Sequence, residues 1–110
     1  MPSDMLKGKR ILVTQAEDFM GPMLCEVLQE HGAIVIASNA DMTDPETPAR
    51  LVADAGHIDI VVANLAVPAP STPAVDVSQQ EWRDTFAALV DPLPRLCQAV
   101  LPSMVARRSG

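Results

Sequence analysis

Three short apolar runs, separated by segments with helical spacing, limit the fold that this chain of 110 residues can adopt. The runs are Lys9–Thr14, Ala33–Ala37 and Ile58–Asn64, and branched side chains are common in them. Short continuous apolar runs are typical of parallel strands that are buried on both faces. A strand, a helix and a second parallel strand within about 30 residues form one crossover unit. The sequence therefore predicts an α/β fold built on three parallel strands.

Local signals place two shorter helices between these runs. Gly21–Pro22 opens the first, because proline is tolerated in a first turn, where its missing N–H is not needed. Asp44, as a possible cap, and Pro45, in a first turn, predict that a second, brief helix begins near this point.

The longest helical pattern runs from residue 78 to residue 107. Ser78 and Glu81 have the spacing of a capping box, in which the two residues satisfy each other's backbone N–H groups. Pro92 and Pro94 interrupt the pattern, so we expect a kink or a break there. The pattern is apolar over more than one face, as in a helix that is buried on two sides or packs against another subunit. We therefore expect a homo-oligomer formed through the long helix 78–107.

Charge and composition exclude several classes of partner. The net charge is −6, so we expect neither nucleic acid nor a membrane as a partner. No apolar run is long enough to cross a membrane, and the N-terminus lacks the apolar core of a signal peptide, so a cytoplasmic location is expected. The cysteines, Cys25 and Cys97, form no metal-ligand spacing with His31 or His57. No metal site is predicted.

The segment Thr14–Gly21, T-Q-A-E-D-F-M-G, lies where a nucleotide-binding fold places its glycine-rich phosphate loop. Such a loop uses one glycine for a tight turn, one for close approach of the pyrophosphate and one for packing of the helix on the strand. Only the third remains here, as Gly21, while Gln15 and Phe19 replace the other two. Two acidic residues at positions 17 and 18 would also repel an anionic cofactor. We therefore expect no nicotinamide cofactor, with the Phe19 ring filling its place.

The order of these segments resembles the N-terminal half of the short-chain dehydrogenase/reductase superfamily over essentially the whole chain. Most of that family has T-G-x-x-x-G-x-G, whereas the spacing Thr14, Phe19, Gly21 resembles the halohydrin dehalogenases, an offshoot that lacks the nicotinamide cofactor. The A-N-L-A-V run at Ala63–Val67 and the segment D-P-L-P-R-L-C-Q-A-V-L-P that begins at Asp91 also resemble that group.

The resemblance implies that residues 1–110 are the N-terminal portion of a single Rossmann-like domain, with strand order 2-1-3 and helices on both faces of the sheet. It implies an enzyme that converts a vicinal haloalcohol into an epoxide and a halide, and opens epoxides with small anions in reverse. A serine, a tyrosine and an arginine would perform this chemistry, and they are expected after Gly110. The chain contains no tyrosine, so we expect it to be inactive alone.

The resemblance also implies positions for the site. A halide or nucleophile pocket would be formed by Thr14, Phe19 and Gly21. The residues expected to flank the substrate are Asn64, Leu65, Ala66 and Val67, followed by the proline-rich stretch 67–73. For the halide to bind, the acidic side chains at positions 17 and 18 would have to point to solvent.

Two alternatives to a dehalogenase remain at this stage. The first is the N-terminal half of an NAD(P)-dependent short-chain dehydrogenase, in which Asp41, about 20 residues after Gly21, could hold a ribose hydroxyl. The second is a non-catalytic assembly module. Phe19 could also serve only to pack the first helix onto the sheet. A Phe19 ring swung aside from an open trough along the strand ends would overturn the dehalogenase interpretation and indicate an ordinary reductase fragment.

Overall fold

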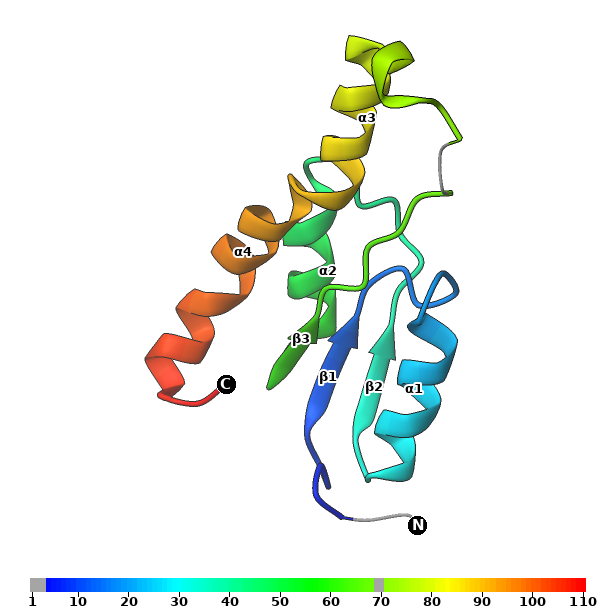
Figure 1. Cartoon of the computed structure of the whole chain (residues 1–110). Coiled ribbons are helices and arrows are strands. Elements are labelled where there is room, and N and C mark those ends of the chain that lie inside the picture. Colours follow the sequence, from blue (N-terminus) through cyan, green and yellow to red (C-terminus); the bar gives the residue numbers. More distant parts are fainter. Residues whose placement is uncertain (1–3, 69–70) are drawn as a thin grey trace.

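A three-stranded parallel sheet forms the centre of the computed structural model, which describes residues 4–68 and 71–110. The strands are β1 (Arg10–Val13), β2 (Ile34–Ala37) and β3 (Ile60–Val62), in spatial order β2-β1-β3 (Figure 1). Each strand lies within one of the apolar runs of the sequence. The predicted strand order, 2-1-3, is confirmed.

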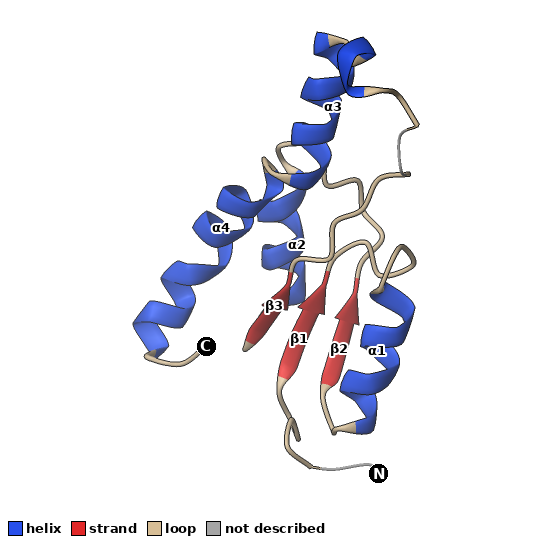
Figure 2. Ribbon diagram, in the orientation of Figure 1, coloured by secondary structure: helices blue, strands red, loops and turns tan. Residues whose placement is uncertain are grey.

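Helices cover both faces of this sheet (Figure 2). Helix α1 (Gly21–Glu30) lies on one face, while α2 (Thr47–Ala55) and α4 (Pro92–Arg107) pack together on the other. A short 3-10 turn, η1 (Ala74–Asp76), precedes α3 (Gln79–Leu89), which extends beyond the carboxyl ends of the strands. The predicted division of the helices between the two faces is confirmed.

The core consists of two clusters because β1 is apolar on both faces. On the α1 side, Ile11 and Val13 pack with Ala16 and Ala33. On the other side, Leu12 forms a cluster with Ile58 and Val100, and partly buried side chains pack against this cluster; these include Leu51, Val52 and Met104. Ile11, Leu12 and Val13 are completely buried, as expected for the central strand of a parallel sheet.

Helix α2 begins later than the sequence predicts. It starts at Thr47, with proline 48 in its first turn, instead of near Asp44–Pro45. The reason is that Asp44 forms a turn of its own: its carboxylate accepts the backbone N–H of Glu46, and its carbonyl accepts that of Thr47. Asp44 therefore ends the loop before the helix and does not cap it.

The break predicted at Pro92 and Pro94 is present, and it divides the long helical pattern into α3 and α4. Helix α3 ends at Leu89, and both prolines lie in the first turn of α4, where no intrahelical N–H is required. At the start of α3, the Ser78 hydroxyl accepts the backbone N–H of Glu81 at 3.0 Å. This contact is one half of the predicted capping box.

A polar cluster fixes the amino end of the sheet, opposite the carboxyl ends of the strands. The Asp59 carboxylate accepts the backbone N–H of Arg10 at 2.8 Å and contacts the His57 ring at 2.8 Å. The Arg10 guanidinium in turn donates to the backbone carbonyls of His57 and Ala55. These contacts hold the start of β3 against β1 and leave the opposite end of the sheet as the place for a ligand.

Candidate functional site

A trough lies at the carboxyl ends of the strands, where open α/β sheets bind their ligands. The chain passes from β1 to β2 on one side and then to β3 on the other, so the topological switch point lies between the loops after β1 and β3. One cavity there has a volume of about 300 Å³, near the lower limit for a small-molecule site. Its lining comes from all three strand-end loops: Gln15, Asp18, Asn39, Ala40, Asp41, Met42, Thr43, Ala66, Val67 and Pro68, with Ala88 from α3.

Buried polar side chains fasten the loop after β1 to the loop after β3. The Thr14 hydroxyl donates a 2.7 Å hydrogen bond to the carbonyl of Asn64. The Asn64 amide donates to the carbonyls of Gln15 and Asp18, both at 2.9 Å. Thr14 is fully buried and Asn64 is 6% exposed. Both residues therefore shape the trough from beneath, and neither lines it.

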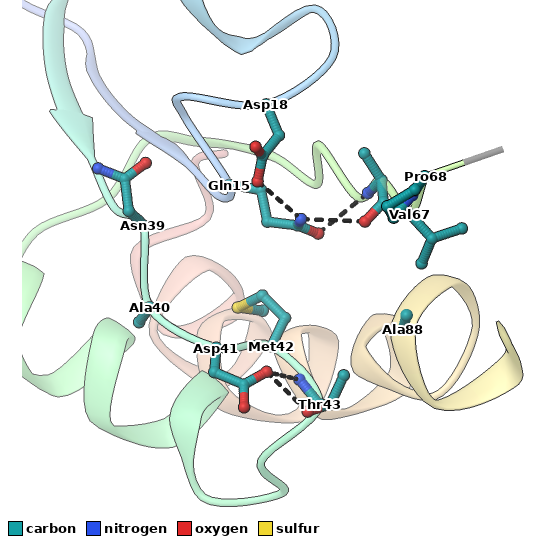
Figure 3. Close-up of a pocket in the computed structure, with 11 residues that line it drawn as sticks. Gln15, Asp18, Asn39, Ala40, Asp41, Met42, Thr43, Val67, Pro68 and Ala88 are labelled. Carbon is teal, nitrogen blue, oxygen red and sulfur yellow. Dashed lines mark hydrogen bonds between the residues drawn. The ribbon is translucent and has the colours of Figure 1, made fainter. Parts of the chain in front are cut away.

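Gln15 crosses the switch point above these contacts (Figure 3). Its side-chain oxygen accepts the backbone N–H of Ala66 at 3.0 Å, and its side-chain nitrogen donates to the carbonyl of Ala66 at 3.1 Å. The same nitrogen donates to the Asp18 carboxylate at 3.1 Å. Gln15 thus pairs with the backbone after β3 much as a neighbouring strand would, and it closes the gap between the two loops.

The loop after β1 keeps a glycine-like backbone without the glycines. Gln15 has φ of 41° and Phe19 has φ of 52°, both in the left-handed region that glycine adopts most readily. Four backbone N–H groups of this loop bond within the protein. Ala16 donates to Ser38, and Glu17 donates to the Asn39 side chain. The N–H groups of residues 18 and 21 also donate to carbonyls of the same loop. An anion site at a helix start needs free N–H groups, so these four groups are not available to an anion.

Gly21 performs the packing role predicted for the third glycine. A Cβ atom at this position would lie 2.3 Å from the carbonyl oxygen of Ala16. Contacts under 3.0 Å to a backbone atom are essentially never tolerated. The start of α1 therefore lies against the loop at a distance that only glycine allows, and Gly21 is buried away from the trough.

Phe19 does not fill the trough as the sequence predicted. Its side chain is 76% exposed, and it borders a second, larger cavity of about 430 Å³ beside the first, together with Ala66, Val67 and Pro68. The reason is the left-handed backbone at Phe19, which follows from the loop geometry described above. Of the three residues expected to form a halide pocket, Phe19 alone borders a cavity in the described part of the chain.

Asp18 also differs from expectation. Its carboxylate bonds to Gln15 and lines both cavities, so it does not point away from the site (Figure 3). Among the residues expected to flank the substrate, Ala66 and Val67 line the trough, while Leu65 is half-buried behind them. Residues 69 and 70 of the proline-rich stretch lie outside the described residues.

Asp41 lies on the opposite wall of the trough, where it closes a turn. Its carboxylate accepts the hydroxyl of Thr43 at 2.6 Å and the backbone N–H of Thr43 at 2.9 Å. The hydroxyl contact, and then the N–H contact, hold the pKa of Asp41 below its ordinary value of 3.8. Asp41 is therefore an ionised, exposed carboxylate that is already engaged by its own loop.

The described residues, 4–68 and 71–110, were also compared with the requirements of a metal site and of a membrane-spanning helix. Within these ranges, no three acidic, histidine or cysteine side chains are grouped so that they could hold a metal ion. In the same part of the chain, no helix combines the length and the hydropathy that crossing a membrane requires.

The fold and the strand-end site define a class of protein, and the chain belongs to it: residues 5–110 match the family described as short chain dehydrogenase. A curated relative, the 2-keto-3-deoxy-L-fuconate dehydrogenase of Xanthomonas campestris pv. campestris, is 30% identical over 99% of this chain and 43% of that protein. The 3-oxoacyl-(acyl-carrier-protein) reductase FabG of Vibrio harveyi is 28% identical over 96% of this chain and 53% of that protein. The chain thus spans about half the length of these relatives.

Solved structures with the same fold include both a dehalogenation enzyme and reductases. A structure described as a dehalogenation enzyme is 31% identical, with a TM-score of 0.85 over 96% of this chain and 52% of that one. A 3-oxoacyl-(acyl-carrier-protein) reductase from Brucella melitensis has a TM-score of 0.86 at 18% identity, over 99% of this chain and 52% of that one, and it shows the fold alone.

Proposed function

We propose that the complete protein is a halohydrin dehalogenase-like member of the short-chain dehydrogenase family that works without a nicotinamide cofactor. The observation that carries this proposal is the loop after β1. Gln15 bridges to Ala66 across the switch point, and the backbone N–H groups of residues 16, 17, 18 and 21 bond within the protein. The likeness to a structure described as a dehalogenation enzyme supports the same assignment.

The proposed reaction is an intramolecular displacement. A base removes the proton of the substrate hydroxyl, and the resulting alkoxide attacks the neighbouring carbon. The carbon–halogen bond breaks, and the halide leaves with the bonding electron pair, which closes the epoxide. The role of the described residues is to shape the small cavity that holds the reacting carbons, with Ala66 and Val67 as apolar walls. The base is expected outside this chain, which contains no tyrosine.

Asp18 sets a condition on where the halide could lie. Like charges about 4 Å apart repel by roughly 4 kcal/mol at an effective dielectric near 20, so an anion beside this carboxylate is disfavoured. The positive edge of the Phe19 ring is available in the second cavity, but Asp18 lines that cavity too, so the proposal requires the halide to lie on the side of the ring away from the Asp18 carboxylate. Thr14 and Gly21 support this region from below and do not contact the ion.

Halide release and nucleotide binding together test this proposal. The complete protein should release bromide from a vicinal bromoalcohol and should show no saturable binding of NADH or NADPH in calorimetry. Oxidation or reduction of an alcohol–ketone pair that depends on NAD(P), with no halide release, would refute it.

An NAD(P)-dependent dehydrogenase or reductase is the second candidate. The names of the curated relatives favour it, since they are dehydrogenases and reductases. The exposed Phe19 ring also leaves part of the strand-end trough open. Micromolar binding of NADH or NADPH by the unmodified protein would establish this candidate over the first.

We also propose that the protein assembles through the outward face of the segment 78–107. Apolar side chains are exposed along α4, and the largest fraction is at Val105, which is 73% exposed. Leu101 and Cys97 lie beside it around one shallow apolar depression. Strong self-association without any small-molecule binding would favour the third class, a non-catalytic assembly module.

A further inference from the structure

Two residues replace glycines in the loop after β1, and the structure gives them different surroundings. Gln15 is half-buried and lines both strand-end cavities, whereas Phe19 is 76% exposed and borders only one of them in the described part of the chain. The more polar and less bulky of the two therefore occupies the more central position. A ligand of the sheet binds at the switch point. The position of a side chain therefore decides whether it blocks the ligand more than its size does.

We propose that Gln15, and not Phe19, is the specificity-determining residue that excludes a dinucleotide from this protein. The inference rests on the proposed cofactor-free function. A dinucleotide bound across the switch point would pass between the loops after β1 and β3. The Gln15 side chain spans that gap, since it bonds to both backbone polar groups of Ala66, which is 51 residues away in the chain.

The bridge is stable because every polar atom of the Gln15 amide has a partner. Its oxygen accepts from Ala66, and its nitrogen donates to Ala66 and to the Asp18 carboxylate. Displacing it would leave the backbone N–H and carbonyl of Ala66 without these partners, and unpaired backbone polar groups are unfavourable. A ligand would also bring its own phosphates beside Asp18, which the bridge holds in place.

Phe19 makes no hydrogen bonds like those of Gln15 to the loop after β3 in the described part of the chain. Its ring is mostly in solvent, and its rotation away from the second cavity would expose little further surface. An aromatic side chain in this position can narrow the entrance to the cavity, but it does not join the two loops. Removing the ring should therefore change dinucleotide binding less than removing the Gln15 amide.

Two matched glycine variants test this inference in the complete protein. Both replaced residues have positive φ, so glycine fits either position without new backbone strain. NADH binding is measured by calorimetry for the unmodified protein, Gln15→Gly and Phe19→Gly. Because the unmodified protein should show no saturable binding, we expect Gln15→Gly to gain saturable NADH binding at least tenfold tighter than the detection limit, and Phe19→Gly to remain without saturable binding.

Two further variants separate the lost bridge from a loosened fold. Gln15→Asn keeps an amide and is tolerated at positive φ, but it is one methylene too short for the bridge, so it should raise NADH affinity in the same direction. Gln15→Glu keeps the length of the side chain and adds a negative charge, so this variant should not raise the affinity for NADH. Circular dichroism melting checks that each variant is folded, and Gln15→Asn replaces Gln15→Gly as the deciding variant if the latter is unfolded.

The outcomes distinguish this inference from the proposed function. If the unmodified protein binds NADH at micromolar concentration, the cofactor-free function fails and this inference fails with it. If the unmodified protein does not bind and no Gln15 variant gains affinity, the function stands and the role of Gln15 is refuted. A gain in Phe19→Gly equal to or larger than that in Gln15→Gly would assign the exclusion to Phe19 and also overturn the inference.

Discussion

The hydroxyl of Thr14 bonds to the backbone carbonyl of Asn64 at 2.7 Å, and this contact joins the ends of β1 and β3 beneath the trough. Both residues are buried, so the bond is protected from water. It links positions 50 residues apart in the chain. The support of the site is thus a long-range contact between two loops, and its strength can be measured by mutation.

Thr14→Val should destabilise the protein by about 1–3 kcal/mol, because valine keeps the shape of threonine but leaves the buried Asn64 carbonyl without its donor. The measurement is the free energy of unfolding in urea. Thr43→Val is the matched control: it removes an exposed hydroxyl contact with Asp41 and should cost less than about 0.5 kcal/mol. Equal losses in the two variants would contradict the role assigned to Thr14.

Asn64→Asp should be more damaging, by about 2–4 kcal/mol, although the two side chains have nearly the same shape. The amide nitrogen of Asn64 donates to the carbonyls of Gln15 and Asp18, and a carboxylate would instead face these oxygens as a buried charge. Asn39→Asp is the control, since Asn39 accepts the Glu17 N–H through its oxygen, which aspartate retains. A mild effect of Asn64→Asp on urea unfolding would count against this network.

Gly21→Ala should destabilise the fold by about 3 kcal/mol, because its Cβ atom would meet the Ala16 carbonyl at 2.3 Å and the backbone would have to move. Gly8→Ala provides the comparison. Gly8 has open space around it but φ of 75°, so alanine there should cost about 1 kcal/mol through backbone strain alone. In thermal unfolding, Gly21→Ala should lose more stability than the control variant. The reverse order would show that the start of α1 does not pack so closely against Ala16 that only glycine fits.

Acid stability should depend on Asp59. The backbone N–H of Arg10, and then the His57 ring, hold the pKa of this carboxyl below its ordinary value of 3.8. A lowered pKa in the folded state means that the contribution to stability is complete above about pH 4, the unfolded value, and is lost as the pH falls through the folded value. Asp59→Asn should therefore flatten the fall in melting temperature below pH 4.

His57→Ala serves as the control for this pH effect. It removes one of the two contacts and leaves the Arg10 N–H, so its curve should lie between those of the unmodified protein and Asp59→Asn. If Asp59→Asn melts with the same dependence on pH as the unmodified protein, the carboxylate contributes nothing at the amino end of the sheet.

Val105→Glu should weaken self-association, since it places a charge on the exposed apolar face of α4. We expect at least a tenfold rise in the dissociation constant, about 1.4 kcal/mol, in sedimentation experiments. Gln29→Glu on α1 adds the same charge to the other side of the sheet and should have no effect. An unchanged dissociation constant for Val105→Glu would show that this face is not an interface.

The sequence by itself determined the elements of the fold that depend on local patterns. Apolar runs gave the three strands, Pro92 and Pro94 divided the last helical segment, and Gly21 kept its packing role. These features depend on hydrophobic periodicity, proline geometry and the small size of glycine, all of which can be recognised within a few residues. The predicted beginning of α2 was wrong by two residues because the Asp44 turn competed with the helix.

Only the tertiary structure decided which side chain occupies the switch point. The sequence showed that Gln15 and Phe19 replace glycines, and bulk favoured Phe19 as the group that fills the site. The direction of each side chain depends on the left-handed backbone of the loop and on the position of Ala66, a partner that lies 51 residues further along the chain. No local pattern encodes that distance, so folding alone brought Gln15 to the gap and left the Phe19 ring in solvent.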